Sequence, residues 1–149
     1  MMKITYLSIL SVFGLAVLTL TGCFPDNDSS YDGPLQVEFR PVEQTLDLSE
    51  ETSYSANIQL IGPHQETAIS VNYEVDAELT TAVRGEHYEL DGNSTQIPAN
   101  SSFAAIQITA DPDAFGDESV QLVIHLLGDD TGEVKVAQNY RTFTLSIEP

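Results

Sequence analysis

Three histidines have the widest chemical repertoire in this chain of 149 residues, because imidazole serves both as a metal ligand and as a general base. His64 follows a Gly-Pro pair, His87 precedes a tyrosine, and His125 stands in an apolar run. No two of them are four residues apart, and neither the His-Glu-x-x-His pattern of zinc proteases nor the Gly-x-Ser-x-Gly elbow of serine hydrolases occurs. The sequence therefore predicts neither a helical zinc site nor an activated serine.

Carboxylates are the most numerous ionisable groups, with 23 Asp and Glu against five Lys and Arg. Paired carboxylates hydrolyse glycosidic bonds in many enzymes. This chain has no Trp to stack on a sugar ring, however, and it is short for a domain with a deep cleft. Because no other catalytic motif occurs, we predict that the protein is not an enzyme.

The single cysteine, Cys23, follows a segment with the order of a secretory signal: a basic residue, Lys3, and then an uncharged apolar run over 4–20. The run ends in a sequence that resembles the lipobox of bacterial lipoproteins, Leu20-Thr21-Gly22-Cys23. The resemblance implies that residues 1–22 are a cleaved signal peptide and that Cys23 carries a diacylglyceryl thioether and an acylated amino group. The alternative is an uncleaved membrane span, for which 4–20 is at the short end.

Acyl chains on Cys23 would hold the protein in a lipid bilayer, since several chains together give stable attachment where one gives only marginal binding. Residues 23–34 are polar and rich in turn formers, which predicts a flexible tether. Asp26 and Asp28 resemble a signal for export to the outer surface, although they equally fit a solvated linker. We expect an outer-membrane location and leave open whether the periplasmic or the external face displays the domain.

Removal of Lys3 with the signal would leave four basic residues against 23 acids, a net charge of −19. Such a field repels nucleic acid, so we predict no nucleic-acid partner. It suits cations, simple solubility or adaptation to high salt, and composition does not choose among these. With Cys23 acylated, no thiol remains for a disulfide or for catalysis.

The rest of the chain, 35–149, is long enough for one domain and shows the two-residue alternation of half-buried strands. Alternation predicts strands at 35–40, 53–60, 69–75, just before Ile97, 104–109, 120–126 and 142–147. The run 120–126 is apolar on part of its second face as well, which predicts a central strand. About seven strands joined by turns indicate an all-β, immunoglobulin-like sandwich.

Three segments of this domain are similar to the Calx-beta domain: Ala-Val-Arg-Gly-Glu-His-Tyr-Glu-Leu at 82–90, Gln-Ile-Pro-Ala-Asn at 96–100, and the acidic loop and strand at 115–124. The resemblance implies an immunoglobulin-like sandwich and, as in some members, calcium bound by loop acids at one end. Its implied ligands here are Glu50, Asp111, Asp113, Asp117 and Glu118. The alternative is that these acids cap and solvate a loop.

Two features depart from the calcium-binding members. His87 stands where they have aspartate, and the chain ends Ser-Ile-Glu-Pro instead of in a run of aspartates. The Gly-x-His-Tyr variant resembles uncharacterised sandwich lipoproteins of bacterial outer membranes, some of which are associated with carbohydrate uptake.

We therefore expect a membrane-anchored surface lipoprotein that acts as a non-enzymatic binding or scaffold module for a protein or glycan partner, through loops or a sheet edge. The alternative is a calcium-binding Calx-beta-type domain whose cofactor site is the loop 111–118.

Overall fold

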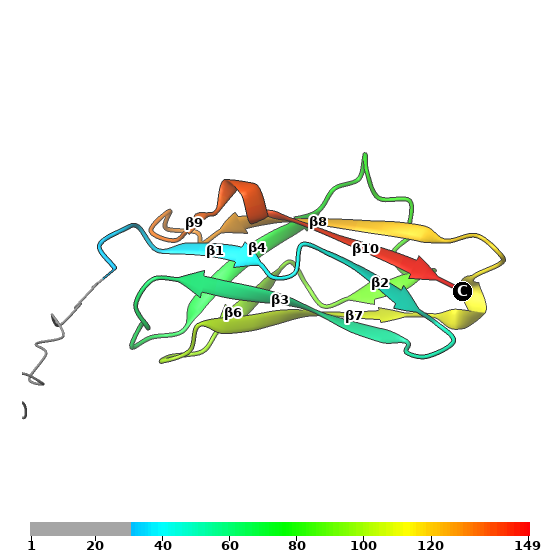
Figure 1. Cartoon of the computed structure of the whole chain (residues 1–149), viewed down its shortest axis with the longest axis horizontal. Coiled ribbons are helices and arrows are strands. Elements are labelled where there is room, and N and C mark those ends of the chain that lie inside the picture. Colours follow the sequence, from blue (N-terminus) through cyan, green and yellow to red (C-terminus); the bar gives the residue numbers. More distant parts are fainter. Residues whose placement is uncertain (1–30) are drawn as a thin grey trace, which may run out of the picture. The chain divides into compact units, whose positions relative to one another are not determined.

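Ten strands form the part of the chain that the computed structural model describes, residues 31–149 (Figure 1). The predicted signal peptide 1–22 and Cys23 lie outside these residues, as does most of the predicted tether. Within 31–149, no helix is long and apolar enough to cross a membrane. The strands are β1 (Gln36–Phe39), β2 (Glu43–Asp47), β3 (Ser53–Ile61), β4 (Ile69–Val75), β5 (Tyr88–Leu90), β6 (Ser94–Ile97), β7 (Phe103–Ala110), β8 (Val120–Gly128), β9 (Lys135–Val136) and β10 (Thr142–Glu148).

The strands form two five-stranded sheets, and the predicted all-β sandwich is confirmed. Sheet one has the order β5-β7-β3-β1-β9, and sheet two the order β2-β10-β8-β4-β6. Most pairs are antiparallel, but β9 runs parallel to β1 and β2 runs parallel to β10. The chain therefore crosses from one sheet to the other between β1 and β2.

The prediction of about seven strands missed β2, β5 and β9. These strands have five, three and two residues. Alternation cannot identify segments this short, and in β2 only Leu46 is buried. Each of them is an edge strand, held in place by the longer strand beside it.

The core lies between the sheets and is built from the inward residues of the longer strands. Phe143 of β10 is fully buried and lies between Phe39, at a ring-centroid distance of 5.4 Å, and Tyr54, stacked at 5.7 Å. β8 pairs with β10 on one side and β4 on the other, which confirms its predicted central position. Its outward residue Val123 is buried as well, because the loop after β4 returns over it and hydrogen-bonds to its backbone. The clustered core residues of the described chain all lie between Leu35 and Ile147.

The loops divide between two ends of the sandwich (Figure 1). At the end where the described chain begins, here the entry end, 31–35 lies with the loops 62–68, 98–102 and 129–134, tied by bonds such as Asn100 N–H to the Gln65 carbonyl at 2.8 Å. At the opposite end, here the far end, the C-terminus lies with 48–52, 111–119 and the later part of the loop 76–87, whose first residues lie over the middle of β8. Two 3₁₀ turns complete the chain, η1 (Pro112–Ala114) at the far end and η2 (Gln138–Tyr140) between β9 and β10.

Candidate functional site

The acidic loop after β7 begins with a local capping motif. The Asp111 carboxylate accepts a hydrogen bond from the Asp113 N–H at 3.1 Å and so caps η1, whose first residue is proline. Aspartate followed by proline is a favourable start for a helical turn, because the side chain satisfies a free N–H and proline needs none. Asp111 is thus engaged by its own loop, whereas Asp113 is exposed.

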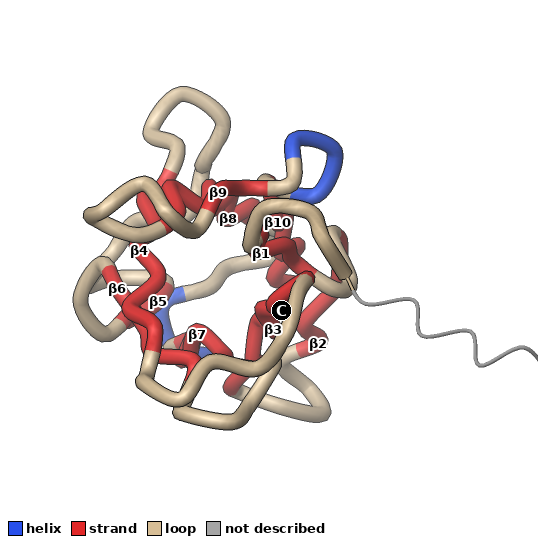
Figure 2. The backbone as a smooth tube through the Cα atoms, turned by 90° about the vertical axis from the view of Figure 1, so that its left-hand side faces the viewer, coloured by secondary structure: helices blue, strands red, loops and turns tan. Residues whose placement is uncertain are grey.

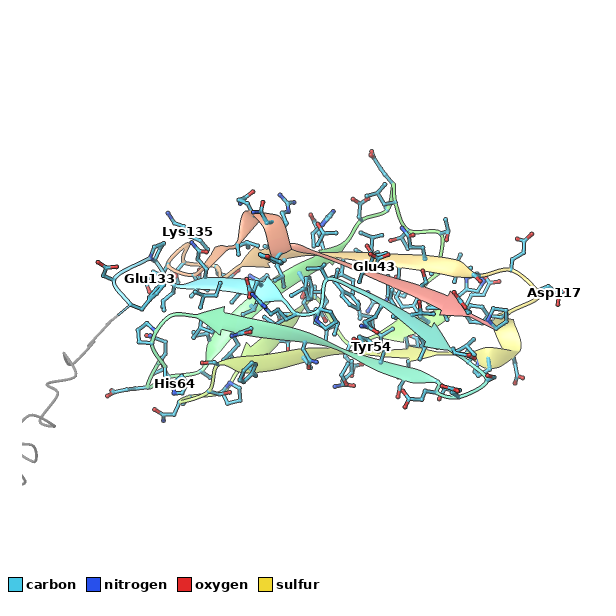
Figure 3. The ribbon with its side chains drawn as sticks, viewed as in Figure 1. Glu43, Tyr54, His64, Asp117, Glu133 and Lys135 are labelled. Atoms are coloured by element: carbon cyan, nitrogen blue, oxygen red, sulfur yellow. The ribbon has the colours of Figure 1, made fainter. Side chains whose placement is uncertain are left out.

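The far end brings most of the predicted ligand positions onto adjacent loops. Asp117 projects from the far end in Figure 3, and Glu118 beside it is also exposed. Glu50 lies in the turn after β2, and the end of that turn contacts the start of the acidic loop through Ala110 N–H to the Thr52 carbonyl at 2.8 Å. Within residues 31–149, no three Asp, Glu, His or Cys side chains are gathered as metal ligands. The calcium assignment stays a prediction.

His87, which stands where the Calx-beta resemblance led us to expect aspartate, contacts its own turn and the acidic loop. Its Nδ1 accepts a hydrogen bond from the Val83 N–H at 2.9 Å, and its ring packs on Phe115 at a centroid distance of 5.1 Å. Its carbonyl accepts from the Asp111 N–H at 3.1 Å. His87 therefore closes the turn before β5 and joins it to the acidic loop. It borders, with Asp117 and Glu118, an open hollow of about 560 Å³.

His125 belongs to a network that the sequence did not reveal. Its Nε2 lies 2.8 Å from Asp76 Oδ2, and its Nδ1 lies 2.9 Å from Thr142 Oγ1. Asp76 also accepts from the backbone N–H groups of Glu78 and Leu79. These hydrogen bonds, that with His125 above all, lower the pKa of Asp76. The acid, imidazole and hydroxyl follow the order of a catalytic triad, but their effect here is to fasten the loop after β4 to β8 and β10.

Glu38 is a buried carboxylate on the outward face of β1. Only 3% of the residue is exposed, and Arg40 Nε donates to Oε1 at 2.5 Å. The Arg40 guanidinium lies 5.4 Å from the centroid of the Tyr140 ring in η2. Alternation placed Glu38 opposite the core, as observed, but it gave no sign that the outer side of the strand is covered. A buried charge needs such a partner, because desolvation is otherwise prohibitive.

Comparison with known proteins gives matches only at the level of structure. No protein-family model matches the chain, and no curated protein matches it. The solved structure of the apo-form Calx CBD1 domain superposes with a TM-score of 0.60 at 21% identity, over 78% of this chain and 97% of that domain. The fold is Calx-beta-like. The predicted resemblance is therefore confirmed for the fold. At this sequence identity the likeness says nothing about ligands, partners or activity.

Two bacterial structures share the Calx-beta-like sandwich. One is a two-domain protein of unknown function from Bacteroides fragilis, with a TM-score of 0.58 at 11% identity over 77% of this chain and 45% of that one. The other is EndoBT-3987 of Bacteroides thetaiotamicron, solved with a Man5GlcNAc product, with a TM-score of 0.52 at 11% identity over 75% of this chain and 30% of that one. The chain thus spans less than half the length of these two proteins.

Proposed function

We propose that this protein is a lipid-anchored, non-enzymatic binding module of the outer membrane, which presents its Calx-beta-like sandwich to a protein or glycan partner. The observation that carries the proposal is the placement of the loops. The described chain enters the sandwich at the entry end, through 31–35, while the loop 111–119 and the later part of the loop 76–87 lie at the far end (Figure 1). An anchor at Cys23 would leave the far-end loops free to contact a partner.

The predicted tether sets how far the domain reaches from the bilayer. Because 31–34 belong to the described entry end, the stretch from Cys23 to Tyr31 is what spans the gap, and it reaches at most about 29 Å when fully extended, at about 3.3–3.6 Å per residue. As a flexible coil the same stretch would have a root-mean-square length of about 16 Å. The sandwich would therefore stay close to the membrane while it reorients, which suits contact with other molecules at the same surface.

A substitution at Cys23 tests the anchor. Cells that express the wild type in radioactive palmitate should yield a labelled protein in the outer-membrane fraction. Cys23→Ser should abolish the label and block maturation or release the protein, because only the thiol forms the thioether. Ser29→Ala in the tether is the matched control and should label normally. Equal labelling of Cys23→Ser and wild type would refute the proposal, and proteolysis of intact cells distinguishes the external from the periplasmic face.

Calcium binding at the far end is a second candidate, favoured by the adjacency of the predicted ligand loops. The loop that carries Asp111, Asp117 and Glu118 is tied to the end of the Glu50 turn by the backbone bond between Ala110 and Thr52. Carboxylates on neighbouring loops are typical ligands of Ca²⁺, which accepts irregular arrangements of six to eight oxygens. All of these carboxylates are exposed, so their side chains are free to reorient toward an ion.

A further inference from the structure

Basic side chains are scarce in the described chain, and two of them border one groove. Residues 31–149 contain four Lys and Arg against 21 Asp and Glu. Arg40 pairs with Glu38, and the Arg84 guanidinium donates to the Leu90 carbonyl. Lys135 and Arg141 form no ion pair within the described residues, although acids outnumber them so strongly. Both instead line a groove of about 580 Å³, here called the β9 groove.

The β9 groove lies where the edge of sheet one meets the start of β10 and the end of β8 in sheet two. Figure 2 shows β9 beside β8 at this seam, and Figure 3 shows Lys135 on the same side of the molecule. Besides the two cations, the lining includes the amides of Gln36 and Gln138 and the aliphatic side chains of Leu127 and Val136. Leu127 is 51% exposed, so apolar surface is available beside the charges.

One acid, Asp129, also borders the groove, but its carboxylate is engaged by its own loop. It accepts hydrogen bonds from the Thr131 hydroxyl and from the N–H groups of Gly132 and Val134. Burial alone would raise the pKa of Asp129, and these hydrogen bonds lower it on balance. Hydrogen bonds within its own loop thus hold the Asp129 carboxylate. Lys135 and Arg141 keep no ion-pair partner among residues 31–149.

The backbone of β9 adds an unpaired strand edge. β9 pairs with β1 alone, and Lys135 N–H and Ala137 N–H both donate to β1-side carbonyls, at 2.9 and 3.0 Å. Peptide groups alternate in direction along a strand, so the N–H and C=O of Val136 point away from β1. An unpaired edge of this kind is a template for an added extended chain.

We propose that the β9 groove binds an extended acidic peptide segment of a partner protein. Its carboxylates would meet Lys135 and Arg141, its backbone would pair with Val136, and its apolar side chains would cover Leu127. A peptide fits better than a sugar chain, because none of the described residues that line the groove has an aromatic ring on which a sugar could stack. The inference rests on the proposed binding function and names the class of partner.

The strong negative charge of the whole chain opposes an acidic partner at long range. Whether such a partner binds therefore depends on how close its carboxylates come to the two cations. At an ionic strength of about 0.15 M, charges on the surface are screened beyond about 8 Å. A peptide seated in the β9 groove is within direct reach of Lys135 and Arg141, but the loop 129–134 beside the groove also carries the acids Asp130 and Glu133. An acidic peptide must therefore contact the two cations directly in order to bind, which the double variant described next tests.

Fluorescence anisotropy on the fragment 31–149 tests the groove; the fragment contains the complete described core and forms a unit of its own. The probe is a fluorescein-labelled nonapeptide of alternating Glu and Val, compared with its Gln–Val counterpart. The wild type should bind the acidic peptide saturably and the Gln–Val peptide at least tenfold more weakly. The double variant Lys135→Gln, Arg141→Gln should bind the acidic peptide about tenfold more weakly than wild type, which is about 1.4 kcal/mol. Raising the salt to 0.5 M should weaken wild-type binding.

Gln96→Glu is the matched control, because it adds one negative charge at an exposed position on the far edge of sheet two without touching the groove. It should bind like wild type, and Lys135→Arg should bind within about twofold of wild type because it keeps the charge.

No saturable binding to the wild type, or equal losses in Gln96→Glu and in the double variant, overturns the inference. Tighter binding of an oligogalacturonate than of the peptide, lost in the double variant, also overturns it and assigns the groove to acidic glycans. The two proposals fail separately. The fragment lacks Cys23, so these binding results do not depend on whether Cys23 is acylated, and palmitate labelling does not depend on whether the β9 groove binds a peptide.

Discussion

Replacing Phe143 by alanine is the sharpest test of the sandwich, because this side chain joins the two sheets. Phe143 is fully buried and contacts Phe39 and Tyr54 across the core. Truncation of such a phenylalanine costs about 3–5 kcal/mol, from lost burial and from the cavity that remains. A domain of this size has a total stability of about 6–18 kcal/mol, at 0.05–0.15 kcal/mol per residue. The variant should therefore lose a large part of its free energy of unfolding and still fold.

Urea denaturation of the fragment 31–149 measures the loss. With an m-value of about 1.5 kcal/mol per M, a loss of about 4 kcal/mol lowers the midpoint by about 2.7 M. Phe103→Ala is the matched control, because Phe103 is 61% exposed on β7. It should change the free energy of unfolding by less than about 0.5 kcal/mol. Equal losses at the two phenylalanines would show that the strand faces are assigned wrongly, since a one-residue slip of register exchanges the two faces of a strand.

The remaining predictions concern loop chemistry. Calcium at 100 times its dissociation constant should stabilise the fragment by about 2.7 kcal/mol, or about 10 °C in melting temperature, and Asp117→Asn with Glu118→Gln should abolish the shift. An equal shift with Mg²⁺ would argue against a calcium site. Hydrogen bonding lowers the pKa of Asp76, chiefly through His125, so Asp76 stabilises the fold above its unfolded pKa of about 3.9 and this stabilisation is lost as the pH falls through its folded pKa. Asp76→Asn should flatten the fall in the free energy of unfolding below about pH 4, and the exposed control Glu66→Gln should leave a steeper fall than Asp76→Asn does.

The longer strands were predictable because each repeats its alternation several times. β3 and β8 have nine residues each, enough to distinguish a period of two from chance. β9 has only two residues and is a strand because it hydrogen-bonds to β1. This pairing depends on the tertiary fold, so no local sequence pattern predicts it. β5 was in turn included in the Calx-beta resemblance, through Tyr88, without being recognised as a strand. Alternation therefore fails in this chain at β2, β5 and β9, three edge strands that depend on a longer neighbour.

The side-chain contacts were hidden for a related reason. Asp76 and His125 are 49 residues apart, and they meet because β4 and β8 are neighbours in sheet two. The Calx-beta resemblance singled out Asp111 as a calcium ligand, but its carboxylate caps η1, a role that the Asp-Pro pair alone would have suggested. The sequence thus showed which carboxylates were present. The partners of Asp76 and Asp111 became visible only in the packed structure.

The two proposals constrain each other through the geometry of the entry end. Lys135 N–H bonds to the Leu35 carbonyl, and Gln36 lines the β9 groove, so the groove lies close to the point where the described chain begins. If Cys23 is acylated, the stretch from Cys23 to Tyr31 keeps that point within about 16–29 Å of the bilayer. A peptide that binds the β9 groove must then reach the same membrane surface, which favours a membrane-associated partner. The far-end loops would point to molecules that arrive from farther away. A soluble partner that bound the groove equally well in the anchored and the released protein would separate groove recognition from anchoring.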